Sequence, residues 1–133
     1  MQTTVTAAFR KTAETFAPGA TTLPQRYFVS AEVYAEEQAA IFSAQWVLVG
    51  HESQIAKAGN YFLREVAGES VIIARDREEN IRGFYNVCRH RGTRLCEEQR
   101  GHSSTIQCPY HAWTYGLDGR LIGAPHMESM PEF

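Results

Sequence analysis

The sequence predicts a mainly β protein with one helix ahead of the strands. Short β-rich segments bounded by turn residues fill the chain after about residue 46, and a single stretch of helical periodicity precedes them. The chain has 133 residues, 44% of them hydrophobic, which is typical of one globular domain. A net charge of -2 gives no basic footprint for nucleic acid, and no apolar run reaches membrane-spanning length. Because the first 22 residues lack the apolar stretch of a secretory signal, we expect a cytoplasmic protein without nucleic-acid or membrane partners.

The helix is predicted over about residues 31–44. Ser30 is a good N-cap, and Glu32 lies in the first turn, where a carboxylate complements the helix dipole. Apolar residues recur on one face at helical spacing. We expect the aromatic side chains Tyr34 and Phe42 to pack on the body of the domain.

The rest of the chain is predicted to form antiparallel strands joined by short turns. The predicted strands are residues 46–49, 61–66, 71–75, 81–87, 105–107, 113–115 and 120–122. Ala67-Gly68 is a predicted turn, and the Asp-Gly pair within residues 116–119 is a strong hairpin signal. The charge-dense segment 76–80 is expected to be a solvated hairpin tip.

Two short segments that each hold one cysteine and one histidine are the strongest chemical signal. The first is Cys88-Arg89-His90, and Cys108-Pro109-Tyr110-His111 follows after seventeen residues. Two such loop tips brought face to face would offer two sulfur and two nitrogen ligands. This set suits a two-iron, two-sulfide cluster with both cysteines on one iron and both histidines on the other. Cys88, His90, Cys108 and His111 are therefore the predicted cofactor and metal ligands.

Two other interpretations of these four side chains remain open. Two cysteines and two histidines also form tetrahedral zinc sites, although zinc fingers usually pair like ligands along the chain and both segments here are mixed. A disulfide between Cys88 and Cys108 is the second alternative, but three cysteines without a secretory signal favour reduced thiols. The third cysteine, Cys96, is expected to be a small buried residue.

The residues around both segments resemble a known family. Residues 86–92, 108–115 and 118–121, together with Pro125, are similar to the N-terminal Rieske domain of the α subunit of Rieske non-haem iron oxygenases, the aromatic-ring-hydroxylating type. The resemblance implies a Rieske-type antiparallel β-sandwich with a cluster-binding subdomain and one N-terminal helix. It covers the chain from about Leu23 onward, as a helical region (25–45) and a Rieske [2Fe-2S] domain (46–133) whose cluster-binding part spans about 86–116. Residues 1–24 are expected to be a loosely ordered arm, because Pro18-Gly19 and Pro24 interrupt any continuous helix there.

The resemblance also implies a function, as an oxidoreductase component. In this family the cluster takes single electrons from a ferredoxin or flavin reductase, and the acceptor is a mononuclear Fe(II) site in a catalytic oxygenase domain. Two histidines and a carboxylate bind that iron, and His51, His102 and His126 do not show the family's spacing for it. We therefore expect this chain to be the N-terminal part of a mono- or dioxygenase α subunit. By itself it would carry electrons and hold no catalytic residue. A homotrimer is possible only for the full-length subunit. A free-standing Rieske ferredoxin-like carrier is the alternative.

In the family, His90 and His111 would each use one nitrogen for iron and keep the other free at the surface. The two histidines are therefore the expected electron exit. Gly92 and Gly101 are candidates for close approach of the backbone to the sulfides.

The reduction potential is expected to be low for a Rieske centre. The respiratory-complex Rieske proteins have an additional cysteine in each loop, but Tyr110 occupies that position in the second loop here. Ala112-Trp113 then stand where those proteins tend to offer hydroxyl donors. Since fewer hydrogen bonds to sulfur stabilise the reduced state less, we predict a potential on the order of -150 mV.

Overall fold

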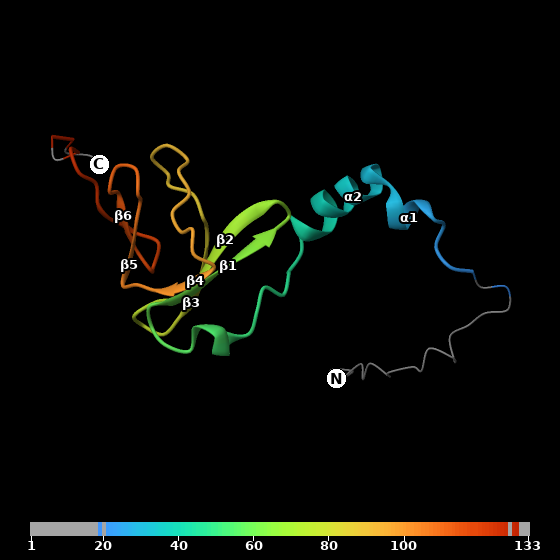
Figure 1. Cartoon of the computed structure of the whole chain (residues 1–133), viewed down its shortest axis with the longest axis horizontal. Coiled ribbons are helices and arrows are strands. Elements are labelled where there is room, and N and C mark those ends of the chain that lie inside the picture. The colour runs from blue at the N-terminus through green and yellow to red at the C-terminus, as the bar shows by residue number, and fades with distance from the viewer. Residues whose placement is uncertain (1–18, 20, 128, 131–133) are drawn as a thin grey trace, which may run out of the picture. The chain divides into compact units, whose positions relative to one another are not determined.

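The computed structural model describes residues 19, 21–127 and 129–130 (Figure 1). Most of the predicted arm over residues 1–24 lies outside the described residues. The chain divides into two compact units, Met1–Ala35 and Glu36–Phe133. Every strand of the described residues belongs to the second unit. None of the described helices has the length and apolar character needed to span a bilayer.

The helical region begins with a short helix, α1 (Arg26–Val29), and continues in α2 (Ala31–Glu37). A π-helical turn over Gln38–Phe42 extends α2, so the helix predicted for residues 31–44 is present but changes its hydrogen-bond period part-way. Ser30 caps α2 as predicted, because its hydroxyl accepts a hydrogen bond from the Val33 amide at 3.3 Å. The same hydroxyl donates to the Glu32 carboxylate and holds the pKa of Glu32 below its usual value.

The side chains of this helical region are not part of the core. Tyr34 is 62% exposed and Phe42 is 41% exposed, so neither is a core residue. Phe42 lines a pocket together with Val49 and Phe84 of its own unit. The packing of Tyr34 on the body of the domain stays a prediction. The helical signal came from periodicity along the chain. Periodicity alone does not show which surface will cover the apolar face.

The larger sheet has four antiparallel strands in the order β3-β2-β1-β4. They are β1 (Asn60–Val66), β2 (Glu69–Arg75), β3 (Ile81–Tyr85) and β4 (Arg100–His102). Ala67 and Gly68 form the β1–β2 turn as predicted, both with positive φ (52° and 82°), which a two-residue hairpin turn of this hand requires. Strand β4 was not predicted, because its three residues lack an apolar pattern and become a strand only by pairing with β1.

The smaller sheet has the order β5-β6-β7. Its strands are β5 (Thr105–Gln107), β6 (Thr114–Gly116) and β7 (Leu121–Gly123), all close to the predicted segments. The strand predicted at residues 46–49 is wrong, because this segment is coil and Trp46 and Leu48 are exposed. The carbonyl of Val49 accepts a hydrogen bond from the Arg64 side chain at 2.8 Å. In a strand, this carbonyl would accept from a backbone amide of the neighbouring strand.

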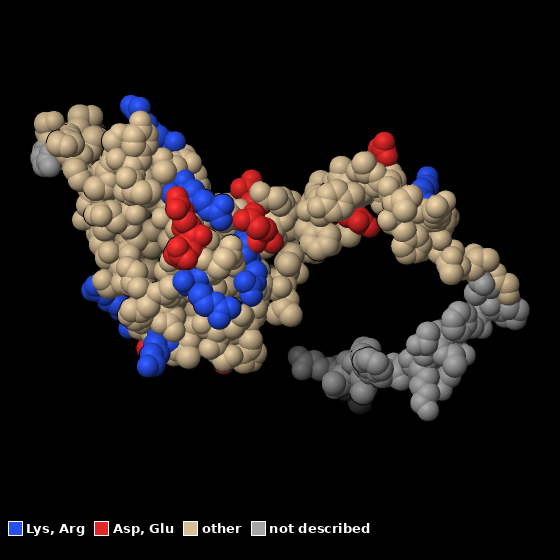
Figure 2. Space-filling view, in the orientation of Figure 1, with Lys and Arg blue, Asp and Glu red and all other residues tan. Residues whose placement is uncertain are grey.

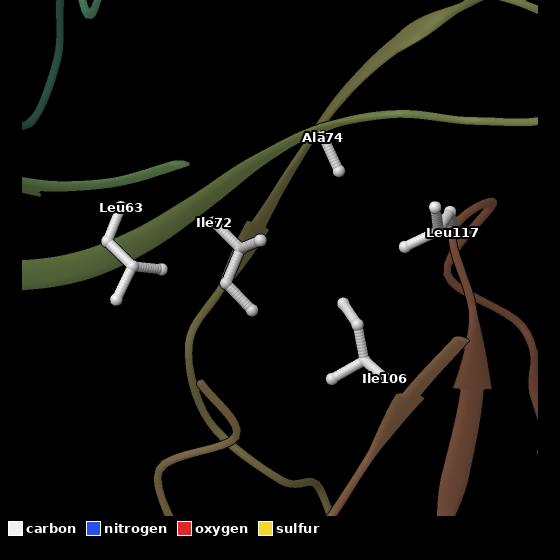
Figure 3. Close-up of a cluster of buried hydrophobic side chains, with 5 residues drawn as sticks. All are labelled: Leu63, Ile72, Ala74, Ile106 and Leu117. Atoms are coloured by element: carbon white, nitrogen blue, oxygen red, sulfur yellow. The ribbon is translucent and has the colours of Figure 1, made fainter. Parts of the chain in front are cut away.

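The main core lies between the two sheets (Figure 3). Leu63, Ile72 and Ala74 extend from β1 and β2 toward Ile106 of β5 and Leu117 of the β6–β7 turn, and all five are buried. Two antiparallel sheets that face each other across an apolar layer form a sandwich. The predicted mainly β fold with antiparallel sheets is therefore confirmed.

The hairpin tip at residues 76–80 is less exposed to solvent than predicted, because its first residue is buried. Asp76 is only 1% exposed and accepts hydrogen bonds from the Asn80 amide (2.7 Å) and from Arg82 Nε (2.9 Å). Burial disfavours the carboxylate, but the bonds from Arg82 and Asn80 outweigh it and lower the pKa of Asp76. The expectation of a wholly solvated tip is thus wrong for Asp76, while the other residues of the tip are exposed.

Candidate metal centre

Two loops with matching backbone geometry carry the four predicted ligands. In each loop, the amide nitrogen four residues beyond the cysteine donates to the cysteine carbonyl: Gly92 to Cys88 at 2.9 Å and Ala112 to Cys108 at 3.1 Å. Gly92 (φ 72°) and Ala112 (φ 59°) both have left-handed backbone. The two loops are therefore structural counterparts, and each turns tightly around its own cysteine.

The two cysteines lie together in a small second core. Cys88 is 1% exposed and Cys108 is 3% exposed, and both pack with Tyr115. Burial disfavours the Cys88 thiolate, but hydrogen bonds from Tyr115, from the backbone N–H groups of His90 and Arg91 and from Cys108 outweigh it and lower the pKa of Cys88. None of the chain's three cysteines is in a disulfide, so the Cys88–Cys108 bridge is not formed.

Tyr115 is a functional residue that the sequence analysis missed, because it was interpreted only as a strand residue. Its hydroxyl lies 3.3 Å from Cys88 Sγ and accepts a hydrogen bond from the Arg89 amide, also at 3.3 Å. With that lone pair used, the hydroxyl proton is available for the sulfur. Burial and the contact with Cys88 raise the pKa of Tyr115 to about 12, so the hydroxyl stays protonated. The sequence predicted few hydrogen-bond donors to the cysteine sulfurs, and the Tyr115 hydroxyl is a donor that this prediction did not include.

The two histidines form a second pair, at the tips of the loops. The rings of His90 and His111 have centroids 4.8 Å apart, and His111 is exposed. Trp113 stacks on His90 with ring planes 7° apart, and Tyr110 stacks on His111 at 3.7 Å between centroids. Desolvation and the nearby charges of His90 and Arg91 lower the pKa of His111. A lowered pKa favours the neutral imidazole, the form that binds a metal.

The pairing of the ligands distinguishes between the candidate metals. Within the residues that the structure describes, no group of three or more His, Cys, Asp or Glu side chains surrounds one point. A structural zinc ion takes four ligands around one point, whereas a cluster with two irons takes two protein ligands on each iron. The buried thiol pair and the separate imidazole pair, in which His111 is exposed and His90 is half-buried, therefore fit a two-iron cluster better than a single zinc ion.

Comparison with known proteins agrees with this chemistry. A family model described as the Rieske [2Fe-2S] domain matches residues 45–133. The chain belongs to this family. The chain is also 39% identical over 112 residues to a carnitine monooxygenase oxygenase subunit of Escherichia coli K12, and 42% identical over 102 residues to a glycine betaine monooxygenase oxygenase subunit of Chromohalobacter salexigens.

Solved structures give the same result for the fold. A quaternary ammonium Rieske monooxygenase in complex with L-carnitine superposes with a TM-score of 0.78 at 40% identity, over 84% of this chain and 32% of that one. Naphthalene 1,2-dioxygenase from Rhodococcus sp. superposes with a TM-score of 0.77 at 38% identity, over 81% of this chain and 24% of that one. The alignment with the carnitine enzyme covers 84% of this chain but only 30% of that enzyme. The alignment with the betaine enzyme covers 77% of this chain and 23% of that enzyme.

Asn86 anchors the first loop of the Rieske domain to the segment that follows it. This buried side chain accepts hydrogen bonds from the amides of Leu95 (3.1 Å) and Cys96 (2.8 Å) and donates to the Cys96 carbonyl at 2.7 Å. Cys96 is half-buried against the main core, and burial raises the pKa of its thiol. Cys96 is thus the small packing residue that was expected, although it is not fully buried.

The remaining site candidates lie elsewhere in the Rieske domain. Gly101 belongs to β4, and a Cβ there would lie 2.6 Å from a carbon of the Tyr61 ring, so this glycine makes room for Tyr61 and not for a sulfide. His51 bonds to Ser53 and His102 bonds to Asn60, in different parts of the chain. Neither histidine contributes to a three-ligand group among the described residues.

Proposed function

We propose that this Rieske domain holds a [2Fe-2S] cluster and transfers single electrons. Cys88 and Cys108 are the proposed ligands of one iron, and His90 and His111 are the proposed ligands of the other. When bound, the cluster supplies a one-electron couple. The observation that supports the proposal most directly is the separation of the donors into a buried thiol pair and an imidazole pair at the loop tips.

The residues around the thiol pair favour negative charge there. The Tyr115 hydroxyl and the backbone N–H groups of His90 and Arg91 all point hydrogen-bond donors at Cys88. Such donors stabilise thiolate charge and raise a reduction potential. The cysteines are closed off from solvent while His111 is exposed, so we propose that electrons leave through the histidine tip.

We further propose that the chain belongs to the α subunit of a Rieske mono- or dioxygenase. The matched relatives are oxygenase subunits, which does not favour the free-standing carrier. In this proposal a ferredoxin or flavin reductase is the donor, a mononuclear iron in the catalytic oxygenase domain is the acceptor, and the full-length subunit forms a homotrimer.

The domain boundaries and the cellular location are further parts of this proposal. Residues 46–133 are the proposed Rieske domain, with its cluster-binding part at about 86–116, and the family match over 45–133 supports this boundary. The three free cysteines support a cytoplasmic location, where thiols stay reduced.

The proposal is tested by ligand exchange in the cluster-loaded protein. His90→Cys and His111→Cys should each shift the EPR spectrum of the reduced protein toward the plant-ferredoxin type or abolish cluster binding. His102→Cys is the matched control, because His102 bonds to Asn60 and lies outside the imidazole pair. An unchanged spectrum in both test variants, or a wild-type protein that accepts no single electron, would overturn the proposal.

A further inference from the structure

A cleft of about 460 Å³ opens beside the thiol pair. Its walls come from β3, from the residues that follow it, and from β6. The lining side chains used below are Phe84, Tyr85, Val87, Arg89, Leu95 and Tyr115. Tyr85 is 65% exposed and Val87 is 43% exposed, so apolar surface continues from the cleft onto its rim.

The charged side chain among the described lining residues of the cleft is basic. Arg89 lines it, and no carboxylate is among its described lining residues. Four arginines and no Asp or Glu occur between Ile81 and Cys96, in a chain whose net charge is -2. In the described part of the chain, Arg82 and Arg94 form salt bridges, whereas Arg89 and Arg91 form none. Figure 2 shows basic side chains at the upper end of the strand-containing unit. The free guanidinium of Arg89 is therefore available to a partner.

The cleft has a direct connection to the proposed cluster ligands. Tyr115 lines it, and the hydroxyl of the same residue contacts Cys88 Sγ. The amide of Arg89 holds that hydroxyl while its side chain lines the cleft. A group placed in the cleft would thus lie one side chain away from the thiol pair, on a surface other than the histidine tip.

We propose that this cleft is the docking site of the electron donor, a protein whose contact surface presents carboxylates around an apolar side chain. The inference rests on the proposed electron-transfer function and adds an entry surface to it. Carboxylates would pair with Arg89, and the apolar side chain would cover Phe84, Val87 and Leu95. This combination of an apolar centre and a charged rim is common in protein interfaces, where the charges set the association rate and the choice of partner.

The test uses an acidic plant-type [2Fe-2S] ferredoxin as the probe and cluster-loaded protein. Its affinity is measured by calorimetry with both proteins oxidised, and its reduction of the chain is followed by stopped flow. Arg89→Glu reverses the charge in the cleft, and Tyr85→Asp adds a carboxylate to the rim without altering a ligand loop. Arg77→Glu is the control, because Arg77 is exposed in the β2–β3 hairpin and does not line the cleft.

Both cleft variants should weaken binding at least tenfold at low salt, and Arg77→Glu should change it less than twofold. Wild-type binding should weaken as the ionic strength rises, because exposed charges are screened. Reduction by methyl viologen radical, a small reductant that needs no docking surface, should differ by less than twofold among the four proteins at high ionic strength, where exposed charges are screened. An unchanged EPR spectrum in Arg89→Glu would show that its effect does not come from disturbing His90.

Equal weakening by Arg77→Glu, or wild-type affinity in both cleft variants, would overturn the inference. A concentration-dependent dimer that Tyr85→Asp disrupts would also overturn it, since a second copy would then cover the cleft. Failure of methyl viologen to reduce the wild-type protein would instead refute the proposed function. In that case the calorimetric arm still decides whether the cleft binds the acidic protein.

Discussion

Replacement of Tyr115 by phenylalanine tests how the protein sets the potential of its proposed centre. The change removes one hydroxyl oxygen and keeps the ring that packs with Cys88 and Cys108. The hydroxyl lies 3.3 Å from Cys88 Sγ, and the Arg89 amide fixes its orientation. A donor to sulfur stabilises the more negative, reduced state more than the oxidised state. We therefore expect Tyr115→Phe to lower the reduction potential.

The size of the shift follows from the strength of one hydrogen bond. A net contribution of about 1 kcal/mol is usual for a buried hydrogen bond. Since 1.36 kcal/mol is a tenfold change in an equilibrium and about 59 mV for one electron, this difference corresponds to about 40 mV. The potential of the variant should therefore lie about 40 mV below that of the wild type.

The assay is a redox titration followed by EPR, with iron and sulfide content measured on the same samples. Tyr110→Phe is the matched control, because the Tyr110 ring stacks on His111 and its hydroxyl makes no hydrogen bond to a described cysteine. The control should shift the potential by less than about 10 mV, a small fraction of one hydrogen bond. A variant at position 115 with a full cluster and an unchanged or higher potential would refute the reasoning.

Three further predictions concern the backbone and the fold. Ala112→Gly should raise the free energy of unfolding by about 1 kcal/mol, because alanine is strained at φ 59°. Gly92→Ala, at the matching position of the first loop, should lower the free energy of unfolding by about as much. Urea midpoints equal to that of the wild type in both variants would contradict this. Gly101→Ala should cost about 1–3 kcal/mol by forcing the Tyr61 ring to move; cluster loss at unchanged stability would instead place this glycine at the centre. Because the pKa of Asp76 is lowered in the folded protein, its ionised carboxylate stabilises the fold at pH values above the pKa of the unfolded carboxyl. This stabilisation is lost as the pH falls through the pKa of Asp76 in the folded protein. The wild type should thus lose its advantage over Asp76→Asn below about pH 4, and equal differences in urea midpoint at pH 7 and pH 3 would disprove this.

The strands that were predicted correctly are those whose signal is local. The β1–β2 hairpin has β-rich segments on both sides of a turn pair that suits positive φ, so neighbouring residues determine it. Residues 46–49 have a comparable apolar run but pair with none of the described strands, and they remain coil. Strand β4 is the converse case, because Gly101 becomes a strand residue only through its pairing with Tyr61. Sequence periodicity describes the segment itself and not the partner that the fold brings to it.

The same distinction applies to the metal centre. The four proposed ligands were predicted because each cysteine lies within three residues of its histidine, and short spacing is visible along the chain. Tyr115 contacts Cys88 across 27 residues, and only the folded loops bring the two together. The match between the loops was hidden in another way, since an alanine at position 112 gives no sign of the left-handed backbone that it adopts.

Iron and sulfide analysis combined with EPR of the reduced protein tests the central claim most directly. Protein made anaerobically with ample iron should contain about two irons and about two acid-labile sulfides per chain. Its reduced spectrum should show nitrogen couplings from two imidazoles, both lost or altered when His90 and His111 are replaced. A colourless protein with one zinc per chain and no labile sulfide would contradict the account.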